Sequence, residues 1–226
     1  MNGNVRLLLL CNSPGEEMRD FLGERTDVLI VPYAQHNKDV AVARFTKQFK
    51  RLGLKATSLH TSRDRDRALD KCEALFFCGG NVFRLLKSLY DFQLIGAIRN
   101  LVLDRGIPFV GSSAGTEVAA PTIHCVNDMP LMLLPSFRAL GLVPYHVSVH
   151  LPAPHQAGAA MREQEIADFH KVHTSPVVAL KEGGMLLVED GAARNIGPSA
   201  IRVFRRSLPT VDVAPEEAIA AEMLEG

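Results

Sequence analysis

The stretch Gly111-Ser112-Ser113-Ala114-Gly115 follows a short apolar run, residues 107–110, and precedes Thr116-Glu117-Val118, which is typical of a helix start. Small residues on both sides of Ser113 allow a strand and a helix to approach closely at a sharp turn. Such a turn exposes the central hydroxyl at the sheet edge and directs the first N–H groups of the helix toward whatever the hydroxyl attacks. The Gly-x-Ser-x-Gly pattern has two interpretations, a nucleophile turn or a strand-to-helix turn without chemistry.

Short apolar runs that end in turn residues recur on the N-terminal side of this turn, at residues 5–11, 27–33 and 74–78. Runs of this length that are apolar on both faces are typical of central strands in a parallel sheet. Apolar residues at helical spacing occupy residues 39–52 and 83–103. Strands that alternate with helices predict an α/β fold, with a doubly wound, mostly parallel sheet flanked by helices.

The C-terminal half has a less regular pattern. Its expected elements are a helix at 161–170 and strands at 143–150, 177–180, 185–189 and 200–204. We expect the earlier helix at 83–103 to break near Gly96, and the last fifteen or so residues to form a polar tail with a weak helix. No linker or internal repeat divides the chain, so the sequence predicts a single domain over residues 1–226.

Three turns that are far apart in the sequence are expected at one edge of this sheet. Asn12-Ser13 and Gly79-Gly80-Asn81 end two of the apolar runs, and Ser113 ends a third. In an open α/β sheet, ligands bind at the carboxyl ends of the strands. The convergence of the three turns favours a nucleophile at Ser113 over a turn without chemistry.

The overall composition argues against nucleic acid as a main partner. The chain of 226 residues carries 25 basic and 25 acidic side chains, and its formal net charge is +0. It has no tryptophan, and aromatic residues make up only 6%. Such a chain lacks both the basic surface and the stacking groups that nucleic acids need.

The cysteines form no Cys-x-x-Cys pair, and no His/Cys cluster has the spacing of a zinc site. Two of the four, Cys11 and Cys78, lie in apolar runs, which favours buried free thiols in a reducing compartment over disulfides. The apolar stretch of residues 7–10 is too short for a signal peptide or a membrane span. We therefore expect a cytoplasmic protein that binds neither a membrane nor a metal or other cofactor.

A serine hydroxyl becomes nucleophilic only when a base accepts its proton and a third group orients that base. Of eight histidines, His146 and His150 share one predicted strand, four residues apart and on one face. His150 ends that strand beside a loop of small residues, so it is the candidate base; a surface or hydrogen-bonded core histidine is the alternative. Asp128, in an Asn-Asp-Met-Pro turn, and Glu182, after a strand, are both candidate acids, and their positions in the sequence do not choose between them.

An oxyanion hole needs backbone N–H donors. The amide of Ala114 directly follows Ser113 and is one candidate, and the Gly79-Gly80 turn can bring a second amide close to a ligand. The alternative for the second turn is an ordinary strand-to-helix connection in which Asn81 caps the helix. No phosphate-binding loop is complete, which argues against a nucleotide-binding, flavodoxin-like protein.

Six short motifs occur along the chain in the order in which one known family carries them. They are Leu7-Leu8-Leu9-Leu10-Cys11-Asn12-Ser13, Gly79-Gly80-Asn81-Val82-Phe83-Arg84-Leu85-Leu86, Gly111-Ser112-Ser113-Ala114-Gly115, Pro121-Thr122-Ile123 with Asn127-Asp128-Met129-Pro130, Arg162-Glu163-Gln164, and Glu182-Gly183. The chain thereby resembles peptidase E, the aspartyl dipeptidase group of the serine peptidase family that also contains cyanophycinase. The resemblance covers nearly the whole chain and implies an α/β fold related to class I glutamine amidotransferases.

The resemblance also implies a Ser-His-acid hydrolase. Ser113 matches the family's nucleophile and His150 its general base. Asp128 matches an aspartate commonly assigned to the relay, and Glu182 matches a glutamate that has also been proposed for it, so the acid stays open between the two.

Further roles follow from the same motifs. Gly80 and Ala114 match the oxyanion-hole amides, and Arg162 matches an arginine thought to pair with the substrate's aspartyl carboxylate. Asn81, in the Gly-Gly-Asn segment, is expected to belong to the substrate site. Bacterial peptidase E commonly has tryptophan in place of Ser112, so we expect a smaller wall beside the nucleophile here.

The expected function is hydrolysis of dipeptides with an N-terminal aspartate, Asp-Xaa, through an acyl-enzyme. The expected partner is a small peptide substrate, and the chain is expected to be a monomer or a homodimer. One alternative is a cyanophycinase-like or other aspartyl-peptide hydrolase of the same family. Another is a catalytically inactive, amidotransferase-like binding module.

Overall fold

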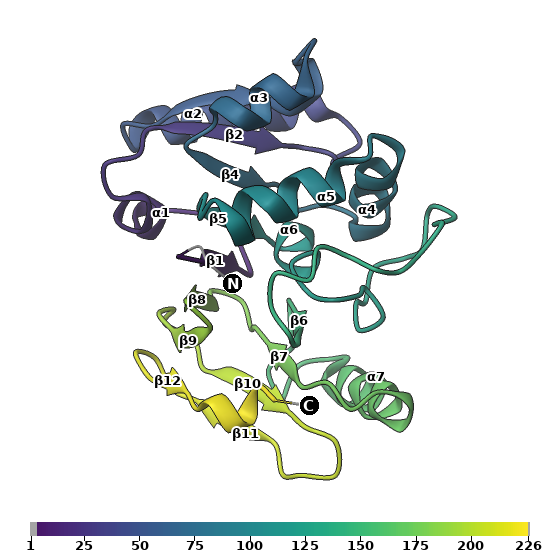
Figure 1. The fold of residues 1–226 in the computed structure, drawn as a ribbon. Coiled ribbons are helices and arrows are strands. Elements are labelled where there is room, and N and C mark those ends of the chain that lie inside the picture. Colours follow the sequence, from purple (N-terminus) through teal and green to yellow (C-terminus); the bar gives the residue numbers. More distant parts are fainter. Residues whose placement is uncertain (1–3, 226) are drawn as a thin grey trace.

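The computed structural model describes residues 4–225, and its larger sheet has eight strands (Figure 1). In spatial order they are β12 (Ala218–Ile219), β9 (Ala192–Asn195), β8 (Met185–Glu189), β1 (Arg6–Leu10), β5 (Phe109–Ser112), β4 (Ala74–Phe77), β2 (Asp27–Val31) and β3 (Lys55–Ser58). The strands from β1 to β3 in this order run parallel, whereas β8, β9 and β12 extend the sheet in antiparallel fashion. The predicted mostly parallel sheet is confirmed.

Helices and short helical turns occur along the whole chain, and those between β1 and β5 connect the parallel strands. They are α1 (Glu16–Leu22), α2 (Lys38–Arg51), the 3-10 turn η1 (Leu59–Thr61), α3 (Arg65–Lys71), α4 (Val82–Asp91), α5 (Leu94–Arg99), the π-helical turn η2 (Asn100–Asp104), α6 (Ala114–Glu117), α7 (Ala159–Val172) and the 3-10 turn η3 (Ala221–Met223). Buried side chains of α1 and α2 pack on one face of the sheet, and those of α3, α4 and α5 pack on the other. Among residues 4–225, no helix combines the length and the apolar character that crossing a membrane requires.

A second sheet of four strands lies beside the first and is built from the C-terminal half of the chain. Its strands, in spatial order, are β11 (Val211–Val213), β10 (Ile201–Phe204), β7 (Val177–Ala179) and β6 (His146–Ser148). Figure 1 shows this sheet with α7 in the green and yellow half of the molecule. Strand β6 ends two residues before His150, so the second sheet positions the candidate base next to Ser113 at the edge of the larger sheet.

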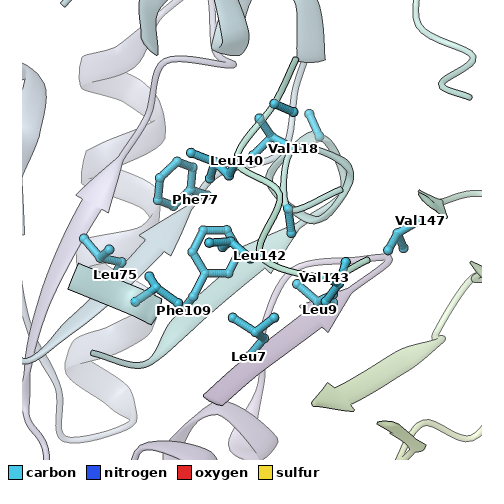
Figure 2. Packing of buried hydrophobic residues seen from close by; sticks show 14 of the residues in the cluster. Leu7, Leu9, Leu75, Phe77, Phe109, Val118, Leu140, Leu142, Val143 and Val147 are labelled. Atoms are coloured by element: carbon cyan, nitrogen blue, oxygen red, sulfur yellow. The ribbon is translucent and has the colours of Figure 1, made fainter. Parts of the chain in front are cut away.

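Alternation along the strands divides the core into two layers. Leu7 and Leu9 of β1 belong to one buried cluster, and Leu8 and Leu10 belong to the other. Successive side chains of a strand point to opposite faces, so a strand that is apolar throughout is buried from both sides. Figure 2 shows the first layer, in which Leu7, Leu9, Leu75, Phe77 and Phe109 lie with Val118, Leu140 and Leu142 from the segment after β5.

Two expectations about element boundaries are wrong. The helix expected at 83–103 breaks at Phe92 and Gln93, where Gln93 has a φ of 55°, and Gly96 lies inside α5. The expected C-terminal tail contains β11 and β12, which add an edge strand to each sheet. Both strands are short, and their pairing partners lie elsewhere in the chain, so local sequence gives little signal for them.

Candidate active site

Ser113 lies in the sharp turn between β5 and α6. Its backbone has φ 50° and ψ −115°, a conformation that costs of order 1–3 kcal/mol for a residue with a side chain and is typical of functional sites. The turn depends on Gly115, because a Cβ built there would lie 2.2 Å from the carbonyl oxygen of Phe77. The small residues of the motif therefore allow α6 to touch β4 and hold the serine in its strained conformation.

The same turn is fixed to the end of β1. The Ser113 amide donates to the carbonyl oxygen of Leu10 at 2.9 Å. The Thr116 hydroxyl donates to that oxygen at 2.8 Å and accepts from the Leu10 amide at 2.9 Å. These buried hydrogen bonds set the height of the serine above the strand ends.

The side chain of Ser113 meets the candidate base and acid in one line of hydrogen bonds. Its Oγ lies 2.9 Å from Nε2 of His150, and Nδ1 of His150 lies 2.5 Å from Oε1 of Glu182. With the Nδ1–H tautomer, the imidazole donates to the carboxylate and accepts from the hydroxyl. His150 also has a positive φ, 56°, so both the candidate nucleophile and the candidate base occupy strained backbone conformations.

Asn12, at the carboxyl end of β1, holds the Glu182 turn in place. Its side-chain amide donates to Oε2 of Glu182, and its Oδ1 accepts from the Gly183 amide at 2.6 Å. The hydrogen bond from Asn12, and to a smaller extent the one from His150, lowers the pKa of Glu182 below its usual value. The carboxylate is therefore ionised at neutral pH and oriented by a second hydrogen bond.

Ser112 also contacts Asn12. It is only 4% exposed, and its hydroxyl donates to the backbone oxygen of Asn12 at 2.9 Å. The hydroxyl thus joins the nucleophile turn to the residue that holds Glu182. The sequence motifs contained Asn12 but gave it no role; its position at the end of a central strand is the signal that could have identified it.

Asp128, the other candidate acid, lies in the loop that follows α6, and its carboxylate contacts the start of α4. Its Oδ2 accepts from the Val82 amide at 2.6 Å, and within residues 4–225 it makes no hydrogen bond to His150. Burial raises the pKa of Asp128, whereas the Val82 amide and the nearby charge of His150 lower it. Asn81 caps the same helix by accepting from the Arg84 amide at 3.0 Å, and its Nδ2 donates to the Met129 oxygen at 2.9 Å.

The two candidate oxyanion donors have free amides. Neither the Gly80 nor the Ala114 N–H donates a hydrogen bond to another group within residues 4–225. Gly80 has a φ of 138°, and a Cβ there would lie 2.5 Å from the carbonyl oxygen of Ala34, so only glycine fits at this position. Both amides are therefore free to donate to an oxygen of a bound substrate.

Arg162 is buried in α7, next to the strand that leads to His150. Its guanidinium donates to Ser148 Oγ at 2.7 Å, to the Cys125 carbonyl oxygen at 2.6 Å and to Glu165 Oε2 at 2.8 Å. Its Nε is buried and has no partner within the described chain. The Nε–H of this buried side chain is therefore unused, beside three internal bonds from the two terminal nitrogens.

Glu117, on α6, is a buried carboxyl that the sequence did not single out. Its Oε1 has no hydrogen-bond partner within residues 4–225, and burial raises its pKa to about 8, with the charge of Asp128 adding to the shift and that of Arg162 opposing it. Glu117 is therefore within electrostatic reach of both Asp128 and Arg162.

A strained serine at a strand-to-helix turn, bonded to an imidazole that is bonded to a carboxylate, defines the serine hydrolase class. The model of peptidase family S51 matches residues 11–196, and the chain belongs to this family.

Relatives with known names extend this finding. A probable alpha-aspartyl dipeptidase from Drosophila melanogaster is 41% identical over 192 residues, which cover 83% of this chain and 80% of the relative. Peptidase E from Streptomyces coelicolor is 34% identical over 235 residues, which cover 98% and 94%. The fold is similar to the crystal structure of a peptidase from an acI-B1 Actinobacterium, with a TM-score of 0.73 and 17% sequence identity. The match covers 96% of this chain and 97% of the other.

Proposed function

We propose that this protein is a serine dipeptidase that hydrolyses dipeptides with an N-terminal aspartate. The hydrogen-bonded line of Ser113, His150 and Glu182 carries the proposal, because it supplies a nucleophile, a base and an orienting acid in contact. Membership of a peptidase family and relatives named aspartyl dipeptidase and peptidase E support the substrate class.

In the proposed reaction, Ser113 Oγ attacks the carbonyl carbon of the aspartyl residue while its proton passes to Nε2 of His150. The imidazolium gives that proton to the leaving amine, which departs as the second amino acid. A water molecule then attacks the acyl-enzyme ester, transfers a proton to His150, and releases aspartate as the proton returns to Ser113. Glu182 stabilises the imidazolium in both halves without itself taking the proton.

We propose Glu182 rather than Asp128 as the acid, since Glu182 is the carboxylate in hydrogen-bond contact with His150. The free amides of Gly80 and Ala114 are the proposed oxyanion donors, worth about 3–4 kcal/mol each in transition-state stabilisation. Their role requires a carbonyl oxygen between the two turns, where each N–H lacks an internal acceptor.

Arg162 is the proposed partner of the substrate's aspartyl side chain. Its unpartnered Nε supports this role, and its Glu165 partner is half-exposed and free to move away from the guanidinium. A carboxylate bound in two places by a guanidinium would be favoured strongly over an uncharged side chain. Asn81 contributes by fixing the Met129 carbonyl beside the same turn.

Replacement of Ser113 tests the proposal directly. Ser113→Ala is expected to abolish hydrolysis of Asp-Xaa dipeptides while the thermal unfolding temperature changes little, because the substitution removes only a hydroxyl. A panel of α- and β-linked aspartyl dipeptides separates this function from a cyanophycinase-like one, which would prefer the β linkage. Substantial turnover by the variant would exclude the serine mechanism, and failure of the wild type to react with a serine-directed phosphonate would favour an inactive binding module.

The proposed setting is the cytoplasm, with the small peptide as partner. All four cysteines are free thiols buried in the described structure, which is what a reducing compartment permits. A monomer or homodimer is proposed, and light scattering on the eluting protein measures which of the two forms.

A further inference from the structure

Cys11 contacts the candidate base but takes no part in the proposed reaction. It follows β1 directly, and its Sγ lies 3.4 Å from Nδ1 of His150 and 3.3 Å from the amide nitrogen of the same residue. Glu182 contacts the same Nδ1 from a different turn. A thiol, an imidazole and a carboxylate thus place one donor atom each within 4.8 Å of one another.

We propose that Cys11, His150 and Glu182 form a binding site for a soft divalent cation, such as Zn²⁺ or Cd²⁺, and that this cation inhibits the enzyme. Thiolate, imidazole and carboxylate are the ligands that zinc prefers, and three protein ligands with one water complete its tetrahedral shell. The sulfur ligand selects against Mg²⁺ and Ca²⁺, which take oxygen ligands.

The distances between donor atoms suit such an ion after one small adjustment. Two ligands on a tetrahedral zinc lie about 3.6 Å apart for sulfur and nitrogen, and about 3.3 Å apart for nitrogen and oxygen. The observed Sγ–Nδ1 distance of 3.4 Å is close to the first value. The Nδ1–Oε1 distance is 2.5 Å, so the Glu182 carboxylate has to withdraw by about 1 Å, which its exposed position allows.

His150 and Glu182 are open to solvent, whereas Cys11 is held inside the protein. The side chains of His150 and Glu182 are 40% and 66% exposed, whereas Cys11 is fully buried. The ion therefore enters from solvent past the carboxylate and meets the thiol last. Metal–sulfur, metal–nitrogen and metal–oxygen bonds form, the thiol proton leaves to solvent, and the ring proton of His150 moves from Nδ1 to Nε2, so that the imidazole stays neutral.

Inhibition follows because the cation occupies Nδ1 and displaces the His150–Glu182 hydrogen bond. The ring proton then lies on Nε2, so His150 has no lone pair with which to take the Ser113 proton, and Glu182 no longer stabilises an imidazolium. This inhibitory consequence rests on the proposed function, whereas the binding site itself does not.

Cadmium binding to the reduced, metal-free full-length chain tests the site without any need for activity. The readout is the ultraviolet charge-transfer absorption of a cadmium–thiolate bond, titrated with CdCl₂ in wild type, Cys11→Ser and Cys72→Ser. Cys72 is the matched control, since it is also a buried free thiol and donates to the Leu69 carbonyl at 3.1 Å, which a serine hydroxyl can replace. Ser113→Ala is added because Ser113 is not a proposed ligand.

The expected result is one cadmium per chain in wild type, Cys72→Ser and Ser113→Ala, with the thiolate absorption lost in Cys11→Ser. For dipeptide hydrolysis, Zn²⁺ is expected to inhibit wild type and Cys72→Ser alike, and Cys11→Ser is expected to need at least about tenfold more zinc relative to its own uninhibited rate. Mg²⁺ at the same concentrations is expected to have no effect.

Three results would overturn the proposal: no cadmium–thiolate absorption in wild type, an unchanged absorption in Cys11→Ser, or an equal loss in Cys72→Ser. Cys11→Ala replaces the serine variant if that variant does not fold. If no form of the protein hydrolyses dipeptides, the proposed function fails while the cadmium titration still decides the metal site.

Discussion

Glu182 and Asp128 both lie within the electrostatic reach of His150, but their hydrogen bonds differ. Glu182 accepts from the imidazole, whereas Asp128 accepts from the Val82 amide at the start of α4. A carboxylate that orients the base is needed whenever Ser113 reacts, and one that serves elsewhere in the site is needed only for the natural substrate. A reagent that reacts with the serine without using the substrate pocket therefore separates the two roles.

Glu182→Gln is expected to slow phosphonate labelling of Ser113 by about 10²- to 10³-fold, because an amide cannot stabilise the imidazolium as a carboxylate does. Asp128→Asn is the matched control: asparagine keeps an oxygen for the Val82 amide, so labelling is expected near the wild-type rate whatever happens to dipeptide turnover. Mass spectrometry of the labelled protein over time measures both rates. Equally slow labelling of the two variants would make Asp128 part of the relay.

At the scale of elements, the contact between α6 and β4 sets the position of Ser113. Gly115→Ala is expected to lower the free energy of unfolding by at least about 2 kcal/mol and to reduce activity, because the new Cβ would lie 2.2 Å from the Phe77 carbonyl oxygen and would push α6 away from the sheet. Urea unfolding monitored by circular dichroism measures the loss.

Gly96→Ala is the control for this substitution. Gly96 lies inside α5, where an added Cβ meets nothing within 4 Å, so alanine is expected to raise stability by about 0.5–1 kcal/mol. An unchanged stability of Gly115→Ala would show that the helix and strand can separate without cost, which contradicts the role given to the small residues of the motif.

At the scale of the whole molecule, histidines gather where α7 meets the segment after α6. His146 is 5% exposed and has Thr122 and Ser175 hydroxyls at 2.8 and 3.1 Å. Burial lowers the pKa of His146 to about 4, with smaller contributions from His173, His124 and His170. The folded protein therefore favours the neutral imidazole.

This burial predicts a loss of stability in acid. The unfolded chain binds a proton near pH 6.5 and the folded chain near pH 4, so the contribution of His146 is complete above pH 6.5 and declines as the pH falls toward 4, by up to about 3 kcal/mol. His146→Gln keeps hydrogen-bonding groups and does not titrate, so its unfolding free energy is expected to fall less between pH 7 and pH 5. Equal slopes for the two proteins would assign the acid sensitivity to other groups.

Much of the parallel sheet was predictable because each of its central strands has a clear pattern in a short stretch of sequence. Runs such as residues 5–11 and 74–78 are apolar on both faces, and only a strand covered from both sides buries such a run. The strands β6, β7 and β10 were expected within residues 143–150, 177–180 and 200–204, but the order of the strands and the separation into a second sheet were not predictable, since these strands pair across distant parts of the chain. The helix break at Gln93 was not predicted, because the sequence gives little indication of where a non-glycine residue adopts a positive φ.

The sequence by itself determined the parallel sheet and the serine that its carboxyl edge presents. The motif around Ser113 predicts the sharp turn by itself, because its small residues, placed between a strand and a helix, fix the turn locally. Only the tertiary structure decided which carboxylate meets His150, since Asp128 and Glu182 differ in contacts that form between distant strand ends. It also brought Cys11 to His150 and Asn12 to Glu182, because both residues follow a strand whose neighbours are set by the packing of the whole molecule.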